Sequence, residues 1–209
     1  WDKMGKDNRR KGNIMLSNTS KMPGKSISLS AFKCQTGEKL SKIPGSVCFD
    51  CYARKGRYRM PNVVDKMEER EKFFNALDFV PQMVDMLNKT RSQFFRWFDS
   101  GDVQSVRMAL NIMDVIEATP EKKHWIPTKE RQIWLDAQKI KPLPKNAVLR
   151  YSATMVDKAP PKSWKHSSAV IKDAAPVGHE CPAPKQGGKC GDCRACWNPD
   201  IKTITYHKH

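Results

Sequence analysis

Apolar residues recur along the chain with two spacings, and each spacing predicts a different kind of element. Short alternating or continuous apolar runs predict strands, whereas apolar residues repeating every three or four positions predict helices that bury one face. The predicted strands are residues 26–32, 94–98, 124–126, 147–152, 168–171 and 201–206. The predicted helices are a segment from residue 62, residues 82–88 after Pro81, a segment from about residue 104, and residues 129–140.

Two of these helices have a well-marked apolar face. In the first predicted helix the face comprises Val63, Met67, Phe74 and Leu77. In the third it comprises Val106, Ala109, Leu110, Met113 and Ile116. Both faces have the width expected of a helix that packs on a sheet.

Strands that alternate with amphipathic helices indicate βα units and hence a parallel sheet in an α/β fold. About five such strands suit an open or partial (β/α) barrel better than a complete eight-unit barrel of roughly 250 residues. We therefore expect residues 1–25 to be a basic N-terminal arm and residues 26–176 the partial-barrel core. Residues 177–209 are expected to be a Cys-rich C-terminal segment that packs on this core.

The composition adds a strong positive charge to this picture. Lysine and arginine number 38 against 22 acidic residues, which gives a net charge of +16 over 209 residues. Such a charge favours nonspecific contact with nucleic acid, although a basic surface also serves solubility alone. No apolar run approaches the roughly 20 residues that a spanning helix needs, and no signal-peptide pattern opens the chain. We therefore expect no membrane contact and a cytoplasmic location. Because the first residue is Trp1, we also expect the natural start to lie elsewhere, with Met4 and Met15 as candidate initiators.

The most specific local motif is a run of three cysteines near the C-terminus. Cys190, Cys193 and Cys196 are separated by two residues each, and Cys181 lies nine positions earlier. Spacings of this kind allow several thiolates to surround one inorganic centre, as in iron–sulfur sites and in four-thiolate zinc sites. The run predicts a metal site without naming the metal.

A second group of cysteines lies earlier in the chain. It consists of Cys34 and the pair Cys48 and Cys51, which would supply three ligands. Three ligands on a four-iron cluster leave one iron open for chemistry. Because seven thiols without a neighbouring histidine are more typical of clusters, we favour a [4Fe-4S] cluster over zinc. The alternative is one structural zinc site built from Cys48, Cys51, Cys190 and Cys193.

Polar residues follow the predicted strands, where α/β folds bind ligands. Asp99, Ser100 and Asp102 come directly after residues 94–98, and we treat them as candidate catalytic residues. Alternatively, Ser100 or Asp102 caps the next helix. Weaker pocket candidates after the following strands are Thr128, Lys129, Arg150, Tyr151 and Ser152.

Other side chains have simpler interpretations. His124 is interpreted as a packed strand residue, and the remaining histidines are assigned no role. Trp97, Trp125 and Trp134 are expected in the core. One loop interleaves basic residues with Tyr52 and Tyr58; the basic residues are Arg54, Lys55, Arg57 and Arg59. Such a loop either contacts an anionic ligand or a nucleic-acid backbone, or forms a solvated surface.

Several of these motifs together resemble the bacteriophage gene product eighty-eight domain family. The resemblance rests on Leu16-Ser17-Asn18-Thr19, Ser28-Leu29-Ser30, Cys34, Cys48-Phe-Asp-Cys51-Tyr52-Ala53-Arg54-Lys55-Gly56, Gly101-Asp102-Val103 and the Cys190–Trp197 run. It covers residues 14–200 and implies an iron–sulfur cluster on a partial barrel, similar to compact radical S-adenosylmethionine proteins. It also implies that Cys34, Cys48, Cys51 and Tyr52 contact the cofactor. The chain departs from the usual radical pattern, since thirteen residues separate Cys34 from Cys48.

Two functions are consistent with these features. In the first, the protein is a phage-type iron–sulfur enzyme whose open iron binds S-adenosylmethionine or acts as a Lewis acid in hydrolysis of a small-molecule substrate, with Asp99 or Asp102 as the base. In the second, the protein is a basic nucleic-acid-binding module, and a zinc ion or a cluster only stabilises its loops.

Overall fold

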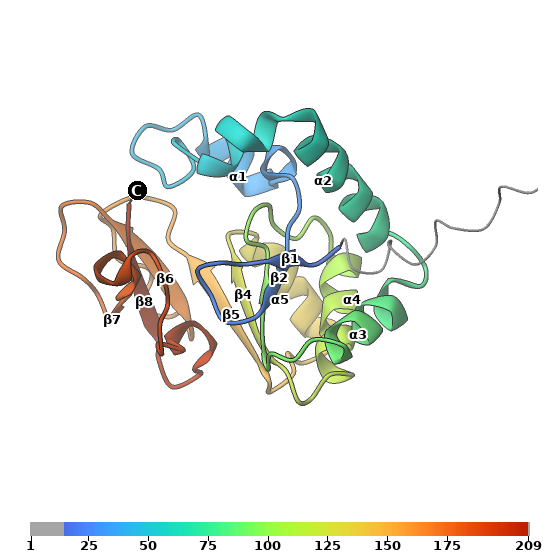
Figure 1. Cartoon of the computed structure of the whole chain (residues 1–209). Coiled ribbons are helices and arrows are strands. Elements are labelled where there is room, and N and C mark those ends of the chain that lie inside the picture. Colours follow the sequence, from blue (N-terminus) through green and yellow to red (C-terminus); the bar gives the residue numbers. More distant parts are fainter. Residues whose placement is uncertain (1–14, 209) are drawn as a thin grey trace, which may run out of the picture.

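The computed structural model describes residues 15–208 as one open, mostly parallel sheet with helices packed on it (Figure 1). The strands are β1 (Ser17–Asn18), β2 (Lys25–Ile27), β3 (Phe94–Trp97), β4 (Lys123–Thr128), β5 (Ala147–Ser152), β6 (Ser167–Ile171), β7 (His179–Glu180) and β8 (Thr203–His207). Their order in the sheet is β1-β2-β3-β4-β5-β6-β8-β7. β1 pairs antiparallel with β2, and every other neighbouring pair is parallel.

The α-helices occupy the connections between the first strands. They are α1 (Gln35–Leu40), α2 (Pro61–Phe74), α3 (Phe79–Asn88), α4 (Val106–Glu117) and α5 (Arg131–Ile140). Short 3-10 helices are η2 (Ala31–Lys33), η3 (Tyr52–Arg54), η4 (Gly56–Arg59), η5 (Ala183–Gln186) and η6 (Ala195–Trp197). Within residues 15–208, no helix combines the length and the apolar character needed to cross a bilayer.

The main core lies between the helices and one face of the sheet. Alternation along β3 directs Phe95 and Trp97 into this core, where Phe74, Ile112 and Trp134 are also fully or almost fully buried. Phe94 and Arg96 therefore lie on the opposite face. There, the Arg96 guanidinium lies 4.6 Å from the Trp125 ring, whose nearest aromatic neighbours are Trp197 and Tyr206. Trp125 is thus buried as predicted, but outside the main core.

The mixed α/β class and the parallel sheet predicted from the sequence are confirmed, and the sheet is not closed. β5 has the predicted bounds, and α4 buries the predicted positions Ala109, Met113 and Ile116. Leu77 was wrongly placed on a helical face, because α2 ends at Phe74 and Leu77 is 93% exposed. The predicted strand 26–32 stops at Ile27, and its last residues form η2 instead.

The N-terminal segment was predicted to be a basic arm through residue 25. Residues 1–14 lie outside the described part of the chain. Ser17 and Asn18 form β1, and Lys25 begins β2, so the described end of this segment contributes to the sheet edge.

The C-terminal segment contacts the sheet through two buried side chains. Arg150 on β5 is fully buried, and its guanidinium donates hydrogen bonds to five backbone carbonyl groups of this segment. The accepting residues are Ala195, Cys196, Asn198, Ile201 and Lys202. Trp197 adds a hydrogen bond from its indole N–H to the carbonyl oxygen of Phe95, at 2.8 Å.

Candidate functional site at the strand ends

The segment between β2 and α2 lies over the carboxyl ends of the central strands (Figure 1). It contains the first three cysteines and is fixed to the strand ends at two points. Leu29 and Ser100 exchange hydrogen bonds with each other, from the Leu29 N–H to the Ser100 carbonyl and from the Ser100 hydroxyl to the Leu29 carbonyl, each 3.0 Å. The buried Glu130 carboxylate accepts hydrogen bonds from the Thr36 amide and hydroxyl, each 2.7 Å.

Cys34, Cys48 and Cys51, here called the cysteine trio, come together beside α1. Cys34 directly precedes α1, and Cys51 follows Cys48 in a turn closed by a hydrogen bond from the Cys51 N–H to the Cys48 carbonyl. The two sulfur atoms of Cys34 and Cys48 both adjoin Gly37 of α1. A Cβ placed on Gly37 would lie 3.6 Å from the Cys34 sulfur and 3.8 Å from the Cys48 sulfur. The same atom would lie only 2.8 Å from the Cys34 Cβ, so a side chain at this position does not fit.

The charges around the cysteine trio have both signs. Burial raises the pKa of the Cys34 thiol well above its usual value, and the nearby Asp102, Cys48, Glu130 and Cys51 raise it further. Burial also raises the pKa of Cys48, although the positive charge of Lys129 opposes this effect. The raised pKa values of Cys34 and Cys48 favour their protonated forms, and a metal that binds these two thiols must displace protons.

Asp102 lies next to the cysteine trio and is held by three hydrogen bonds. Its carboxylate accepts from the Val103 amide at 2.8 Å, the Thr128 hydroxyl at 2.7 Å and the Lys129 amide at 2.7 Å. Burial raises its pKa to about 6, although these hydrogen bonds act in the opposite direction. The Asp102 carboxylate thus joins the end of β3 to the end of β4.

Ser100 and Asp99 have different surroundings. The Ser100 hydroxyl is buried and bonded to the Leu29 carbonyl, so its role is to position the loop. The predicted alternative, a helix cap at Ser100 or Asp102, is wrong, because Ser105 caps α4 and accepts the Met108 amide at 3.1 Å. Asp99 lines a cavity, and its Oδ1 atom is buried without a hydrogen-bond partner among the described residues.

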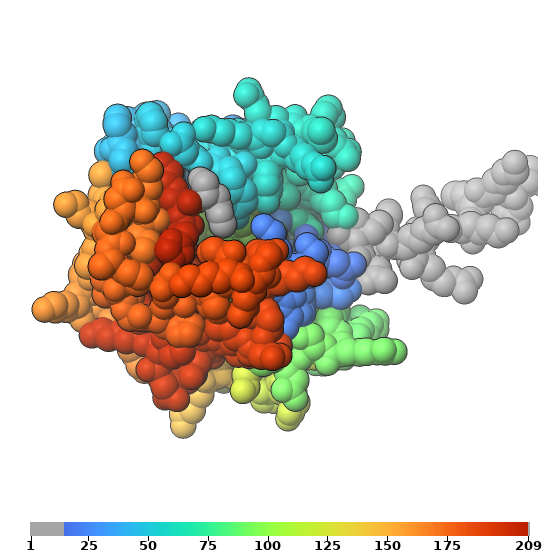
Figure 2. Space-filling model, turned by 60° about the vertical axis from the view of Figure 1, so that its left-hand side comes forward, coloured from blue at the N-terminus to red at the C-terminus, as the bar shows by residue number. Residues whose placement is uncertain are grey.

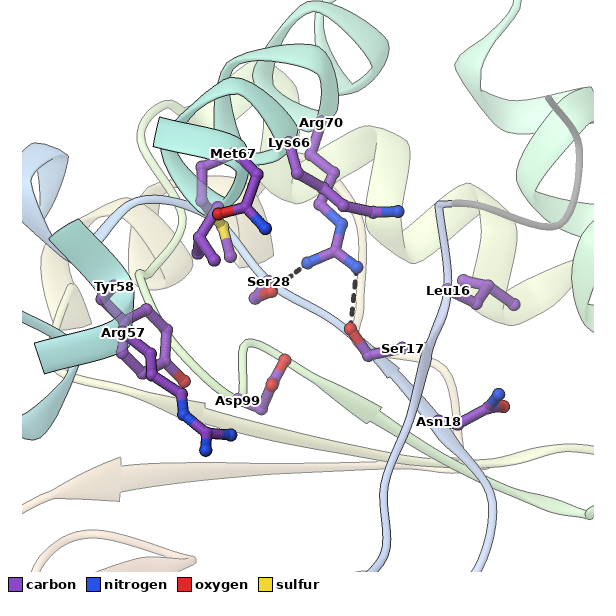
Figure 3. A pocket seen from close by; sticks show the side chains of 12 residues that line it. Leu16, Ser17, Asn18, Ser28, Arg57, Tyr58, Lys66, Met67, Arg70 and Asp99 are labelled. Carbon is purple, nitrogen blue, oxygen red and sulfur yellow. Dashed lines mark hydrogen bonds between the residues drawn. The ribbon is translucent and has the colours of Figure 1, made fainter. Parts of the chain in front are cut away.

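This cavity has a volume of about 630 Å³ and lies between β1, η4, α2 and the loop after β3 (Figure 3). Its polar lining includes Arg57 and Tyr58 from η4 and Lys66 and Arg70 from α2. Tyr52, which follows Cys51, connects the cavity to the cysteine trio. Its ring is mostly exposed, yet its hydroxyl donates a hydrogen bond to the Asp99 carbonyl.

The four C-terminal cysteines form a second group, here called the cysteine quartet: Cys181, Cys190, Cys193 and Cys196. Burial raises the pKa of Cys190, and the neighbouring Cys181 and Cys193 raise it further. Cys181 also lies near enough to influence Cys196. The segment that carries them lies against the N-terminal strands (Figure 2), where the Cys190 amide donates to the Lys21 carbonyl. The Cys196 sulfur lies 3.2 Å from the Tyr206 hydroxyl, and burial raises the pKa of Cys196 to about 12.

His179 is a residue of this second group that sequence reasoning missed. Its Nε2 atom lies 3.5 Å from the Cys193 sulfur. Its position two residues before Cys181 was an available signal, and the premise that no histidine neighbours the thiols is wrong. The parallel pairing of β7 with β8 places His179 near the cysteine quartet.

Among residues 15–208, no three or more His, Cys, Asp or Glu side chains are close enough to hold a single metal ion. A tetrahedral zinc ion with Zn–S bonds of about 2.3 Å requires sulfur atoms about 3.8 Å apart. A four-iron cluster is larger than one ion, so its thiolates must stand farther apart. The Cys34 and Cys48 sulfurs both lie near the position that a Cβ of Gly37 would occupy.

The remaining candidates are mostly engaged in structural contacts. Arg150 binds the C-terminal segment, and Thr128 binds Asp102. The Tyr151 hydroxyl contacts Gln138, and the Ser152 hydroxyl contacts Ser168. In the basic loop, Arg54 pairs with Glu38 at 2.6 Å and Lys55 pairs with Asp50 at 2.9 Å, whereas Arg57 lines the cavity.

Comparison with known proteins gives a family but no characterised relative. The profile of the family described as "Gene product 88" matches residues 2–199, nearly the whole chain. No curated protein and no solved structure matches the chain.

Proposed function

The chain belongs to the gene product 88 family of bacteriophage proteins, and from this starting point we propose that it is an iron–sulfur enzyme. Cys34, Cys48 and Cys51 would hold a [4Fe-4S] cluster at the carboxyl ends of β3 and β4. When bound, such a cluster supplies an iron without a protein ligand, which can act as a Lewis acid on a substrate oxygen or bind S-adenosylmethionine for one-electron chemistry.

The observation that carries the proposal is the glycine at position 37. Glycine within a helix costs about 1 kcal/mol relative to alanine. Gly37 is nevertheless present in α1, where a Cβ would project toward the Cys34 and Cys48 sulfurs. Because Gly37 has no Cβ, the space beside the Cys34 and Cys48 sulfurs stays free. This free space supports a bound group larger than one ion.

The chain's own residues around the cysteine trio provide a charged and partly dry environment. Lys129 and Arg54 are the cations that act on Cys48, and both favour its thiolate. Asp102 is the base candidate that lies nearer to the cysteine trio. Its carboxylate, however, already accepts three hydrogen bonds, which join the ends of β3 and β4. Asp99 has the freer carboxylate, because its Oδ1 atom has no partner among the described residues and the residue lines the cavity. We therefore assign the base role to Asp99 in preference to Asp102.

The cysteine quartet would form a second, structural metal site under this proposal. It connects β7, η6 and the start of β2 without lining the cavity beside the cysteine trio. The contact between His179 and Cys193 places a nitrogen donor beside the cysteine quartet. We propose that the two groups bind metal independently.

Metal and sulfide analysis of protein purified without oxygen tests this proposal. The full chain should contain iron and acid-labile sulfide in equal amounts, near four of each per chain for a four-iron cluster. A variant with Cys34→Ser, Cys48→Ser and Cys51→Ser should lose the iron and the sulfide. A variant with serine at all four positions of the cysteine quartet is the matched control and should keep them. Iron retained in the first variant, or stoichiometric zinc without sulfide in the full chain, would refute the cluster assignment.

The alternative function is a nucleic-acid-binding module, which the net charge of +16 favours. Lys55, Lys172 and Lys208 line a surface hollow next to Tyr52. Asp50 lies in the same hollow and pairs with Lys55 and Lys208, which leaves a net charge of +2 there. A binding function of this kind predicts an affinity for DNA that falls steeply with salt concentration. It also predicts that serine at the cysteine trio leaves this affinity unchanged as long as the protein stays folded.

A further inference from the structure

The cavity beside the cysteine trio contains a buried arginine that forms no direct ion pair with a carboxylate of residues 15–208. Arg70 is only 2% exposed. Its guanidinium donates to the Met15 carbonyl at 2.9 Å, to the Ser17 hydroxyl at 2.7 Å and to the Ser28 hydroxyl (Figure 3). All of these acceptors are neutral. Asp99 is close enough for its charge to act on Arg70, but it does not pair with the guanidinium directly. A buried charge without a direct ionic partner is costly, so the site favours an added anion.

Two further cations line the same cavity. Lys66 lies one helical turn before Arg70 on α2, and Arg57 approaches from η4 (Figure 3). Among residues 15–208, none of the three cations forms an ion pair with a carboxylate. Burial and the neighbouring Arg70 both lower the pKa of Lys66, as expected where like charges face one space.

The cavity also contains an acidic residue that can accept a hydrogen bond from a ligand. Asp99 is the acid among the described lining residues, and its Oδ1 atom is buried and without a partner. An oxygen of this kind accepts a hydrogen bond from a ligand hydroxyl or amine group. The cavity thus combines a cationic part for an anion with a separate acceptor for a donor group.

The charges and the size specify the ligand class. Arg57, Lys66 and Arg70 together with Asp99 give the lining a net charge of +2. A phosphate monoester carries about −1.5 to −2 at neutral pH, whereas a single carboxylate carries −1. The volume of about 630 Å³ is typical of sites for small organic ligands.

We propose that this cavity binds a small phosphate monoester that also carries hydroxyl groups, with the phosphate at Arg57, Lys66 and Arg70 and a hydroxyl at Asp99. The binding stands by itself, but its interpretation as substrate binding rests on the proposed function. The connection to the cysteine trio is short, because Tyr52 follows Cys51 and its hydroxyl bonds to the Asp99 carbonyl.

Calorimetric titration with ribose 5-phosphate, ribose and inorganic phosphate tests the inference. Ribose 5-phosphate should bind, inorganic phosphate should bind more weakly, and ribose should not bind detectably. Lys66→Gln and Arg57→Gln should each weaken binding of ribose 5-phosphate about tenfold. Arg59→Gln and Lys72→Gln are the matched controls, because both residues are exposed, lie on the same elements and are not among the lining residues. Asp99→Asn should weaken binding of ribose 5-phosphate but not of inorganic phosphate.

Three results would overturn the inference: equal binding of ribose and ribose 5-phosphate, no binding of ribose 5-phosphate, or equal losses in cavity and control variants. If the cavity variants and the control variants lose equal affinity for a 5′-phosphorylated oligonucleotide, the binding of phosphate groups depends on the general surface charge and not on the cavity, which would also overturn the inference. The same titration on the variant with serine at the cysteine trio separates this inference from the proposed function. Retained binding in protein that contains no cluster would support the cavity even if the cluster assignment fails.

Discussion

Two buried acids fix the loops above the sheet. Asp102 joins the end of β3 to the end of β4, and Glu130 holds α1 through Thr36. Because each carboxylate oxygen accepts at least one hydrogen bond, removal of either side chain would leave buried donors unpaired, at about 1–3 kcal/mol each. The sequence marked Asp102 and Thr128 as candidates after successive strands, but it gave no indication that they bond to each other. It did not predict Glu130, because nothing in its surroundings suggests a partner ninety-four residues away at Thr36.

His124 gives a pH-dependent contribution to stability that can be measured. It is fully buried, accepts a hydrogen bond from the Trp97 indole N–H at 3.1 Å, and lies 3.0 Å from the Thr119 hydroxyl. Burial lowers its pKa from 6.5 to about 3. Between these values the unfolded chain binds the proton and the folded chain does not. The stability that neutral His124 contributes is therefore present above pH 6.5 and is lost as the pH falls toward 3.

We expect the free energy of unfolding to fall by up to about 1.4 kcal/mol per pH unit below pH 6.5 through this residue. Urea unfolding at pH 7.5, 6 and 5 measures this dependence. In a His124→Gln variant, whose side chain does not titrate, the slope should be smaller by that amount, while Asp102 titrates in both proteins. Equal slopes in the two proteins would show that His124 is protonated in the folded state.

At the level of elements, α1 has a role that only the structure reveals. Six residues are too few for a helix that is stable alone, and its sequence lacks an apolar face. Its position depends on Glu130, and its Gly37 separates the Cys34 and Cys48 sulfurs. The thirteen residues between these cysteines conceal their proximity in the sequence. By contrast, α4 and β5 were predictable, because their apolar patterns are long and regular.

A Gly37→Ala variant tests the role of α1 in metal binding. Alanine is the better helix former by about 1 kcal/mol, so any loss must come from its methyl group. That group would lie 2.8 Å from the Cys34 Cβ and less than 4 Å from both sulfurs. We expect at least a severalfold loss of bound iron. Lys39→Ala in the same helix is the exposed control and should retain the iron. Full iron content in Gly37→Ala would contradict our interpretation of this glycine.

The C-terminal segment depends on Arg150 in a similar way. The sequence marked Arg150 as a pocket residue, because it occurs near the end of a strand. Its guanidinium instead binds five backbone carbonyl groups between Ala195 and Lys202, all of which precede β8. Strand order alone could not reveal this contact, since the segment has few apolar residues and β7 is only two residues long.

An Arg150→Met variant should therefore lose more than about 3 kcal/mol of stability, because several buried carbonyl groups lose their donor. Hydrogen exchange should become faster in residues 193–202 before it does in α4. Metal bound by the cysteine quartet should be lost first. Arg131→Met is a suitable control, because Arg131 is exposed and its guanidinium lies over the Tyr151 and Trp164 rings. Unchanged exchange in residues 193–202 would show that Trp197 alone holds the segment.

For the molecule as a whole, the open sheet brings distant segments to its two sides. The cysteine trio and the cavity lie at the carboxyl ends of the first strands, and the cysteine quartet lies with the last strands. The net charge of +16 attracts anions in general. The charge alone could not predict the cavity, because its three cations come from two elements and are brought together by the fold.

The central claim is that the cysteine trio holds a cluster with one iron open to ligands. Electron paramagnetic resonance of the reduced protein tests it most directly, using the variant with serine at all four positions of the cysteine quartet. This variant should show the spectrum of a reduced four-iron cluster, and added cyanide, as a probe for the open iron, should shift that spectrum. A variant that contains no cluster signal and no iron, while it remains folded, would contradict the account.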